Sequence, residues 1–332
     1  MTTFLSYIYA QACLAPESLW GKLKAKFFWH LRLWLLSQTY LKNFPVSMYV
    51  YGETLSMPLS HNLPLMLADK PLYDSLLKRI AHHLRQRDGF VSLVDVGANI
   101  GDTVIACRLE PGDTALSIEP NPEYWPYLQL NLQLCKGRTL SAQSLVGCVD
   151  RIMRVSATTS QGTACYTTKE SGECVQVRTI PSLMSATGMK HCNFLKIDTD
   201  GHDFDCLRGA VPILQHSQPA VLFEADCFMN ENYGKELISI VSMLIGMRYT
   251  LFILYTHDGH FFGFYTSESS EELYKAAFYQ TLSKKLYFDI LALPSSIFLA
   301  SELEYFVNIE KDSSRSRTAH NIASAMMRPS DA

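Results

Sequence analysis

Residues 94–101 read Val-Asp-Val-Gly-Ala-Asn-Ile-Gly and follow the apolar run Val91-Ser92-Leu93. The pattern predicts a buried strand, a tight turn that contains two glycines, and the first turn of a helix. Glycine lets a backbone turn sharply and approach a ligand closely, and a helix start presents unpaired N–H groups. Such a turn at the carboxyl end of a parallel strand is where open α/β sheets bind nucleotide-like cofactors.

The residues inside the turn distinguish two classes of cofactor. The dinucleotide fingerprint G-x-G-x-x-G has a glycine in its middle, whereas Asn99 lies between Gly97 and Gly101 here, so NAD is disfavoured. The form D-x-G-x-N-x-G resembles motif I of S-adenosylmethionine (SAM) dependent methyltransferases. Glu119 follows the next apolar run, where an acid can accept hydrogen bonds from both ribose hydroxyls. NAD enzymes place an acid there too, so Glu119 alone does not discriminate.

Further blocks of sequence follow the glycine turn in a fixed order. They are Asp95-Val96-Gly97-Ala98-Asn99-Ile100-Gly101, Ile118-Glu119-Pro120-Asn121-Pro122, Leu195-Lys196-Ile197-Asp198-Thr199-Asp200-Gly201, Leu207-Arg208-Gly209-Ala210 and Phe223-Glu224. In order and spacing these blocks resemble the FkbM family of methyltransferases. The resemblance implies a SAM-dependent enzyme, and the family is associated with O-methylation of sugars, polyketides and other natural products.

One block departs from the family pattern. The family usually reads K-x-D-x-E-G-x-E after the fourth strand, whereas Asp200 and Asp203 stand here in place of the two glutamates. The shorter side chains keep the charge but lose the reach of about one methylene group, which affects the local geometry and the acceptor specificity rather than the fold.

Apolar runs and helical patterns alternate over residues 89–310, which we assign to a SAM-binding methyltransferase domain. Strands are predicted at 91–96, 115–119, 140–149, 193–198, 219–224, 249–255 and 287–293, and Asp258-Gly259 predicts a hairpin turn after the sixth. The alternation predicts an α/β, Rossmann-like class I methyltransferase fold with a seven-stranded, mostly parallel sheet and helices on both faces. Residues 151–180 form a β-rich insertion or sheet extension, and residues 311–332 a disordered tail.

Residues 1–88 are expected to form an N-terminal helical extension and a cover segment. In residues 16–38, apolar side chains recur at helical spacing, namely Trp20, Leu23, Phe27, Leu31, Trp34 and Leu35, with Lys22, Lys24, Lys26 and Arg32 among them. No acidic residue occurs between Glu17 and Glu53. Two interpretations stay open: a peripheral helix in a membrane interface, or a helix that packs its apolar stripe on the catalytic domain or on a second subunit of a homodimer. Residues 46–70 are expected to be extended, and residues 71–87 helical.

The cofactor-binding candidates take their roles from their places in the predicted sheet. Asp95, at the end of the first strand, is expected near the methionine amine of SAM, directly or through water. Gly97 and Gly101 give the backbone room, Asn99 orients the loop, and Glu119 binds the ribose. The alternative roles are a turn or helix cap for Asp95 and a plain surface acid for Glu119.

The catalytic candidates are Asp198, His202 and Glu224. Asp198 and Glu224 end the fourth and fifth strands and are expected to face the cleft. Imidazole titrates near neutral pH and suits a general base, although His202 could equally be a surface residue beside a helix cap. The carboxylates after the fourth strand could instead bind Mg²⁺, but helix capping explains them as well, so no metal is assigned.

Composition limits the other classes of function. The 332 residues are 48% hydrophobic with a net charge of −3, so no overall basic field favours nucleic acid. Nine cysteines without a C-x-x-C pair favour a reducing compartment, and we expect a cytoplasmic protein, at most peripheral at a membrane. The leading hypothesis is a methyltransferase that acts on a hydroxyl of a small molecule or glycan. The alternatives are a nicotinamide-dependent oxidoreductase and a non-catalytic scaffold that associates through its N-terminal helix.

Overall fold

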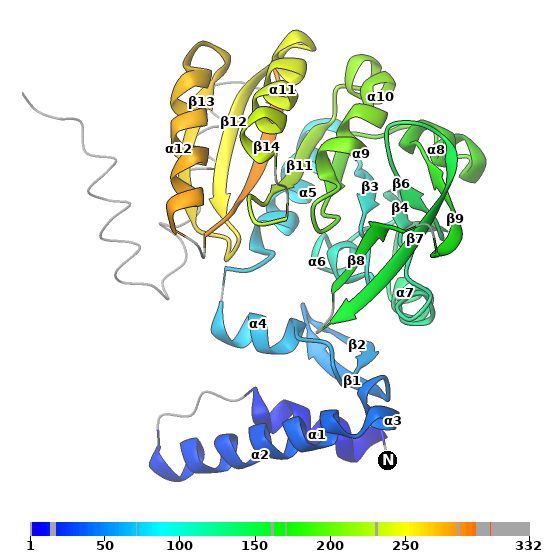
Figure 1. The fold of residues 1–332 in the computed structure, drawn as a ribbon, viewed down its shortest axis with the longest axis vertical. Helices are drawn as coiled ribbons and strands as arrows, with labels where there is room; N and C mark the ends of the chain where they lie inside the picture. The colour runs from blue at the N-terminus through cyan, green and yellow to red at the C-terminus, as the bar shows by residue number, and fades with distance from the viewer. Residues whose placement is uncertain are drawn as a thin grey trace, which may run out of the picture.

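The computed structural model describes residues 2–13, 18–70, 72–160, 163–169, 171–229, 232–283, 286–296 and Phe306. The predicted tail at 311–332 lies outside these residues. Figure 1 shows a central sheet with helices on both sides, a second small sheet beside it, and two N-terminal helices at one end of the molecule. The described part of the chain therefore has the layered α/β architecture that the sequence predicts.

The central sheet contains eight strands in the order β13-β12-β14-β11-β10-β3-β4-β5. They are β3 (Ser92–Val96), β4 (Thr114–Ile118), β5 (Arg138–Ala142), β10 (Phe194–Ile197), β11 (Ala220–Ala225), β12 (Tyr249–Thr256), β13 (Phe261–Thr266) and β14 (Phe288–Pro294). The pairs from β5 to β11 are parallel, whereas β14 runs antiparallel between β11 and β12. All seven predicted strand regions contribute to this sheet.

The eighth strand is a correction to the predicted count of seven. β13 pairs antiparallel with β12 at the edge of the sheet, and the predicted turn at Asp258-Gly259 joins the two strands. The aromatic run that forms β13 lacks the alternation of apolar and polar residues by which a half-buried strand is recognised. The hairpin was therefore visible in the sequence through its turn, but its second strand was not.

Helices cover both faces of the sheet and bury separate apolar cores. One face packs against α5 (Ser75–Asp88), α6 (Asp102–Ala106) and α7 (Trp125–Leu132). The other face packs against α8 (Ile180–Thr187), α9 (Asp203–Gly209), α10 (Val211–His216), α11 (Tyr233–Gly246) and α12 (Ser270–Ser283), which follows the short 3-10 turn η1 (Ser267–Ser269). The helical pattern at 207–214 is divided between α9 and α10 because Pro212, in the first turn of α10, cannot donate a backbone hydrogen bond.

The β-rich region forms a separate four-stranded sheet in the order β6-β9-β7-β8. Its strands are β6 (Leu145–Val146), β7 (Arg151–Ser160), β8 (Thr163–Thr168) and β9 (Glu173–Arg178). In Figure 1 it lies on the side of the central sheet that carries β4, away from β12 and β13. A cysteine thiol of α9 donates to the carbonyl of Val146, so the small sheet is tied to the helix that follows β10.

The N-terminal region forms a third layer, although its elements differ in part from those expected. It contains α1 (Thr2–Ala12), α2 (Leu19–Ser37), α3 (Thr39–Lys42), the hairpin β1 (Pro45–Val50) and β2 (Glu53–Pro58), and α4 (Leu63–Asp69). The helix α4 corrects the expectation of extended chain at these residues, and Pro64 in its first turn is compatible with a helix start. The layer shares one apolar cluster with Ile100, Ile105 and Tyr124, which lie directly after the glycine turn and β4.

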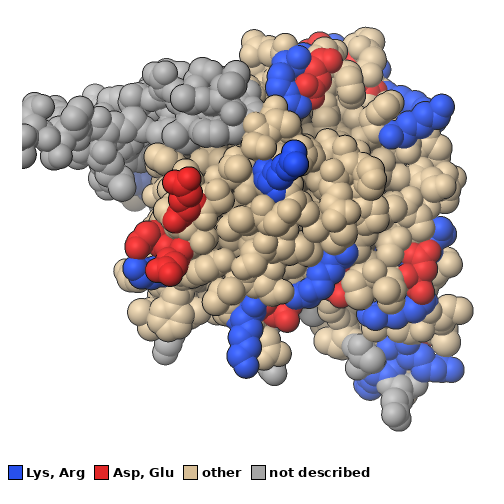
Figure 2. Space-filling view, turned by 90° about the horizontal axis from the view of Figure 1, so that it is seen from above, with Lys and Arg blue, Asp and Glu red and all other residues tan. Residues whose placement is uncertain are grey.

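Charged side chains are dispersed over the face of the molecule opposite the N-terminal helices. Figure 2 shows Lys and Arg in small groups, intermixed with Asp and Glu, among uncharged residues. An extended strip of Lys and Arg is what a phosphate backbone requires. This face of the described residues carries no such strip.

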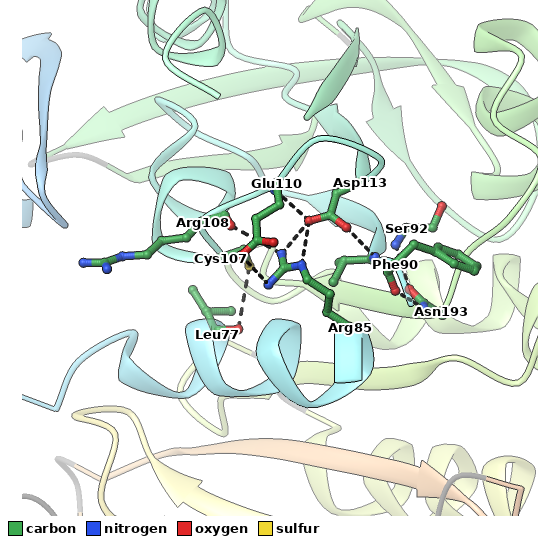
Figure 3. Close-up of polar contacts among 10 residues, drawn as sticks. Leu77, Arg85, Phe90, Ser92, Cys107, Arg108, Glu110, Asp113 and Asn193 are labelled. Atoms are coloured by element: carbon green, nitrogen blue, oxygen red, sulfur yellow. Dashed lines mark hydrogen bonds and ion pairs between the residues drawn. The ribbon is translucent and has the colours of Figure 1, made fainter. Parts of the chain in front are cut away.

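A polar network joins the amino ends of the central strands, far from the glycine turn (Figure 3). The buried carboxylate of Asp113 accepts hydrogen bonds from the backbone N–H of Val91 and Glu110, both at 2.8 Å, and from the Arg85 Nε at 3.1 Å. Asn193 bridges the start of β3 to the preceding loop by accepting from Ser92 N at 2.7 Å and donating to Phe90 O at 3.0 Å. The network fixes α5 and the strand register at the end of the sheet that carries no cavity residues.

Replacing Asp113 with alanine is expected to lower the free energy of unfolding by about 3–5 kcal/mol, because the substitution leaves Arg85 without its buried partner. Urea denaturation followed by circular dichroism measures the change. Glu110→Ala is the matched control, since Glu110 is exposed and lies 3.7 Å from the same guanidinium. Its removal should cost at most about 1 kcal/mol, and equal losses in the two variants would contradict the assignment.

Candidate active site

A cavity of about 470 Å³ lies at the carboxyl ends of β3, β4, β10 and β11. Its wall includes Gly97 and Asn99 of the glycine turn, Glu119 after β4, Asp198 and His202 in the loop between β10 and α9, and Glu224 in β11. The volume is within the range of small-molecule and cofactor sites, which is about 300–1,000 Å³. Six of the eight predicted site residues therefore line one cavity. Asp95 and Gly101 do not.

The glycine turn approaches the loop after β10 at backbone distance. Gly97 has a φ of 82°, and a Cβ atom placed on it would lie 1.7 Å from the carbonyl oxygen of Asp198. Gly101 also has a positive φ, 86°, and forms the N-cap of α6. Only glycine combines this backbone conformation with such a contact at position 97, so this residue lets the two loops of the site meet.

Glu119 links the glycine turn to the loop after β4 through two backbone hydrogen bonds. One carboxylate oxygen accepts from Asn99 N and the other from Asn121 N, each at 2.7 Å. Burial raises the pKa of Glu119 to about 7, although the two amide bonds lower it. A carboxylate has about four acceptor positions, so Glu119 keeps the capacity to accept hydrogen bonds from a ligand in the cavity.

Asp95 is fully buried and does not line the cavity. Its Oδ1 lies 3.7 Å from the Lys196 Nζ, and Lys196 is its register partner on β10. Burial raises the pKa of Asp95 to about 7, while Lys196 acts in the opposite direction. A direct contact with the methionine amine thus has no support in this geometry, and the expected role of Asp95 stays a prediction that would operate through Lys196 or water.

Lys196 links the buried carboxylate to the cavity. Its Nζ donates to the Asp198 Oδ2 at 3.0 Å, and its side chain lines the cavity. Burial alone lowers the pKa of Lys196, but Asp198 and Asp95 raise it well above its usual range. Lys196 therefore bridges two acids, Asp198 at the cavity and the buried Asp95.

The three catalytic candidates have different environments. Asp198 is paired with Lys196, whereas the His202 ring Nε2 lies 2.8 Å from the backbone oxygen of Tyr166 in β8. Burial and the carboxylates of Asp198 and Asp203 raise the pKa of Glu224 well above its usual range. Its Oε2 atom has no hydrogen-bond partner among the described residues, so Glu224 is the candidate whose carboxyl group has a position open to a ligand.

Asp203 is not a helix cap of the expected kind. The N-cap of α9 is His202, without a side-chain capping bond, and Asp203 is the first helical residue. Asp203 accepts a hydrogen bond from Thr199 Oγ1 at 3.1 Å, and burial together with Asp198 raises its pKa to about 7. It does not line the cavity. Its hydrogen bond with Thr199 instead stabilises the loop after β10.

Several cavity residues had no motif in the sequence to indicate them. His61, Asn62, Tyr73 and Asp74 come from the cover segment, Asp102 begins α6, and Tyr287 precedes β14. The His61 Nε2 lies 3.1 Å from the Asn99 Oδ1, and burial lowers the pKa of His61 despite the opposing charge of Asp102. Among these residues, only Asp102 had a signal in the sequence that could have indicated it, because it follows Gly101 at the predicted helix start.

Acidic side chains outnumber basic ones around the cavity. Two of the described lining residues, Lys196 and Arg151, are basic. Seven are acidic, namely Asp74, Asp102, Glu119, Asp198, Asp200, Asp205 and Glu224. A cleft lined mainly by one sign of charge attracts ligands of the other sign. The cavity is therefore suited to a ligand that carries positive charge. The described residues include no group of three or more His, Cys, Asp or Glu side chains placed to hold a metal ion.

Comparison with known proteins gives the family of the domain. Residues 95–254 match the sequence model of the methyltransferase FkbM domain. No curated protein matches the chain. Solved structures with similar folds include the methyltransferase FkbM from Methylobacillus flagellatus KT (18% identity, TM-score 0.33) and the precorrin-6y C5,15-methyltransferase from Geobacter metallireducens GS-15 (12%, 0.36). A TehB-like SAM-dependent methyltransferase from Corynebacterium glutamicum ATCC 13032 Kitasato is also similar (10%, 0.33).

The alignments differ in how much of each protein they include. The first covers 46% of this chain and only 37% of the Methylobacillus protein. The other two cover 66% and 67% of this chain and 88% of the Geobacter and Corynebacterium proteins.

The central sheet carries the cavity at its carboxyl edge, as α/β folds that bind nucleotide-like cofactors do. The match over residues 95–254 identifies an FkbM methyltransferase domain in this part of the chain. This confirms the resemblance seen in the sequence, and the family implies the use of SAM.

Gly97→Ala is expected to prevent stable folding or to lower the free energy of unfolding by about 3 kcal/mol or more, since the new methyl group would overlap the Asp198 carbonyl. Thermal and urea denaturation measure the effect. Gly246→Ala in α11 is the control, because no atom lies within 4 Å of its Cβ position. The control should change stability by at most about 1 kcal/mol, and a Gly97→Ala protein of unchanged stability would refute the contact.

Proposed function

We propose that the protein transfers the methyl group of SAM to a hydroxyl group of a sugar, a glycan or another small natural product. The observation that carries the proposal is the cavity in which Glu119, beside the glycine turn, and Glu224, at the end of β11, share one acid-rich wall. The sulfonium and ammonium groups of SAM are positive, so the charge of this wall fits the cofactor. An NAD-type pyrophosphate is negative and fits it poorly.

The residues of the chain have distinct tasks in this proposal. The glycine turn and Glu119 hold the nucleoside part of the cofactor, and Asp198, with Lys196, faces its reacting end. Bound SAM supplies a reactive sulfonium methyl group, so the protein mainly aligns the reactants and excludes water. Alignment can contribute about 7–11 kcal/mol in favourable cases.

A hydroxyl acceptor must also lose a proton, and the cavity wall offers two bases. Glu224 has a carboxyl oxygen without a hydrogen-bond partner among the described residues, and His202 also lines the cavity. A positioned base adds about 10²- to 10⁴-fold to the rate. The presence of these groups supports oxygen as the target atom.

Calorimetric titration with SAM and S-adenosylhomocysteine tests the cofactor and its site. We expect Glu119→Ala to weaken binding about 10- to 100-fold, because a hydrogen bond to a charged group contributes about 1.5–3 kcal/mol. Glu123→Ala is the matched control, since Glu123 is an exposed acid four residues further on. This variant should bind SAM as the unmodified protein does. Absence of binding by either ligand to the unmodified protein would contradict the proposal and favour a scaffold role.

Glu224→Gln and His202→Ala distinguish the two bases once an acceptor has been found among hydroxylated sugars and natural products. The variant that lacks the base should bind SAM normally and lose about 10²- to 10⁴-fold in turnover. Because the pKa of Glu224 is raised, a Glu224 base predicts a rate that is low at acidic pH and rises at a higher pH than an ordinary carboxylate would give. A rate that is unchanged in both variants would exclude both residues and leave Asp198.

A further inference from the structure

The outer face of α2 is apolar and aromatic. Trp20, Phe27 and Trp34 are 83%, 62% and 60% exposed, and Leu19 and Leu23 are exposed beside them. These residues lie on one stripe of the helix, at steps of three and four residues. Most of the apolar stripe seen in the sequence therefore does not pack on the catalytic domain.

The opposite face of α2 fixes this orientation through a buried cation. The Arg32 side chain is 2% exposed, lies 4.3 Å above the ring of Tyr9 in α1, and donates to the Leu59 carbonyl at 3.1 Å. Leu35 is buried on the same face. Rotating α2 to bury its tryptophans would move Arg32 out of this site, so the apolar stripe stays at the surface.

The surroundings of the stripe are basic. Lys22, Lys24 and Lys26 are exposed in the same turns of α2. Glu17 is the single Asp or Glu in the first 52 residues of the sequence. Figure 1 places α1 and α2 together at the end of the molecule away from α10, α11 and α12, so no part of the described catalytic domain covers this face.

We propose that this face of α2 docks on the surface of an anionic lipid bilayer. The helix would lie in the plane of the interface, with its tryptophans, Phe27 and leucines among the upper acyl chains and its lysines at the negative headgroups. Tryptophan is enriched at this depth because its ring is apolar and its N–H is polar. None of the described helices is long and apolar enough to cross a bilayer, which agrees with a helix that lies on the membrane.

A second copy of the chain fits this face less well. A two-fold dimer brings the same surface of both subunits together. Lys22, Lys24 and Lys26 would then approach the same lysines of the partner with no carboxylate on α1 or α2 to offset them. An anionic membrane supplies the missing negative charge.

The docking helix is also connected to the cavity wall. An Arg32 nitrogen lies 3.4 Å from the carbonyl oxygen of His61, and His61 lines the cavity. The docked helix is thus joined to the cavity through one side chain.

Vesicle flotation of the full chain tests the docking. We expect binding to vesicles of phosphatidylcholine with about 30% phosphatidylglycerol to exceed binding to pure phosphatidylcholine on the order of 100-fold at low salt. Salt should weaken the binding. Three of the four tryptophans lie in α2, so intrinsic fluorescence should shift to the blue and be quenched by brominated acyl chains.

Matched variants separate the stripe from exposed apolar residues in general. Trp20→Ser with Trp34→Ser should lower vesicle binding at least about tenfold, while Phe278→Ala with Leu282→Ala, which removes similarly exposed side chains from α12, should leave it unchanged. Equal binding by both pairs of variants, or no binding to anionic vesicles, would overturn the proposal. So would a dimer, measured by light scattering, that the Trp20 and Trp34 substitutions dissociate. None of these readouts depends on methyl transfer.

Discussion

The close approach of two backbone segments is the constraint on which the site depends. The Cα of Gly97 lies against the carbonyl of Asp198, so the turn after β3 and the loop after β10 meet above the edge of the sheet. Neighbouring parallel strands alone would leave these loops at separate positions. Their contact, together with the two backbone bonds that Glu119 accepts, converts the edge of the sheet into a walled cavity.

Charge is the second organising feature, and it has a cost for the free protein. Burial raises the pKa values of Asp74, Asp95, Glu119 and Asp203 to about 7. An acid whose pKa is raised on folding destabilises the folded state as the pH rises from about 4 to about 7, because the unfolded chain then releases its proton more readily. A cationic ligand near the cavity acids, Asp74 and Glu119 among them, favours their charged forms and offsets part of this cost. The same carboxylates that weaken the free protein therefore contribute to recognition of a positive cofactor.

The sequence predicted the central strands well because their runs are short, apolar and bounded by turn residues. It also predicted Glu119 and Glu224 at the cavity, since residues that end adjacent parallel strands meet at one edge. It did not show how side chains pack in three dimensions. Asp95 ends a strand as expected and is buried beside Lys196, so its role near the cofactor stays a prediction. The cover-segment residues His61 and Asp74 reach the cavity from a region without any motif.

The helix α2 shows most clearly why an apolar stripe does not by itself identify a buried face. Its stripe of tryptophan, phenylalanine and leucine has the spacing of a core-facing surface, but the buried residues of α2 are Arg32 and, of the stripe, only Leu35. A guanidinium can be buried when carbonyl oxygens and an aromatic face replace its water, and the carbonyls of Leu59 and His61 and the ring of Tyr9 do so here. Because those carbonyls belong to the segment that carries His61 into the cavity, the same contact that turns the aromatic stripe outward also positions part of the active-site wall. One buried charge therefore links the orientation of α2 to the placement of His61 in the cavity wall.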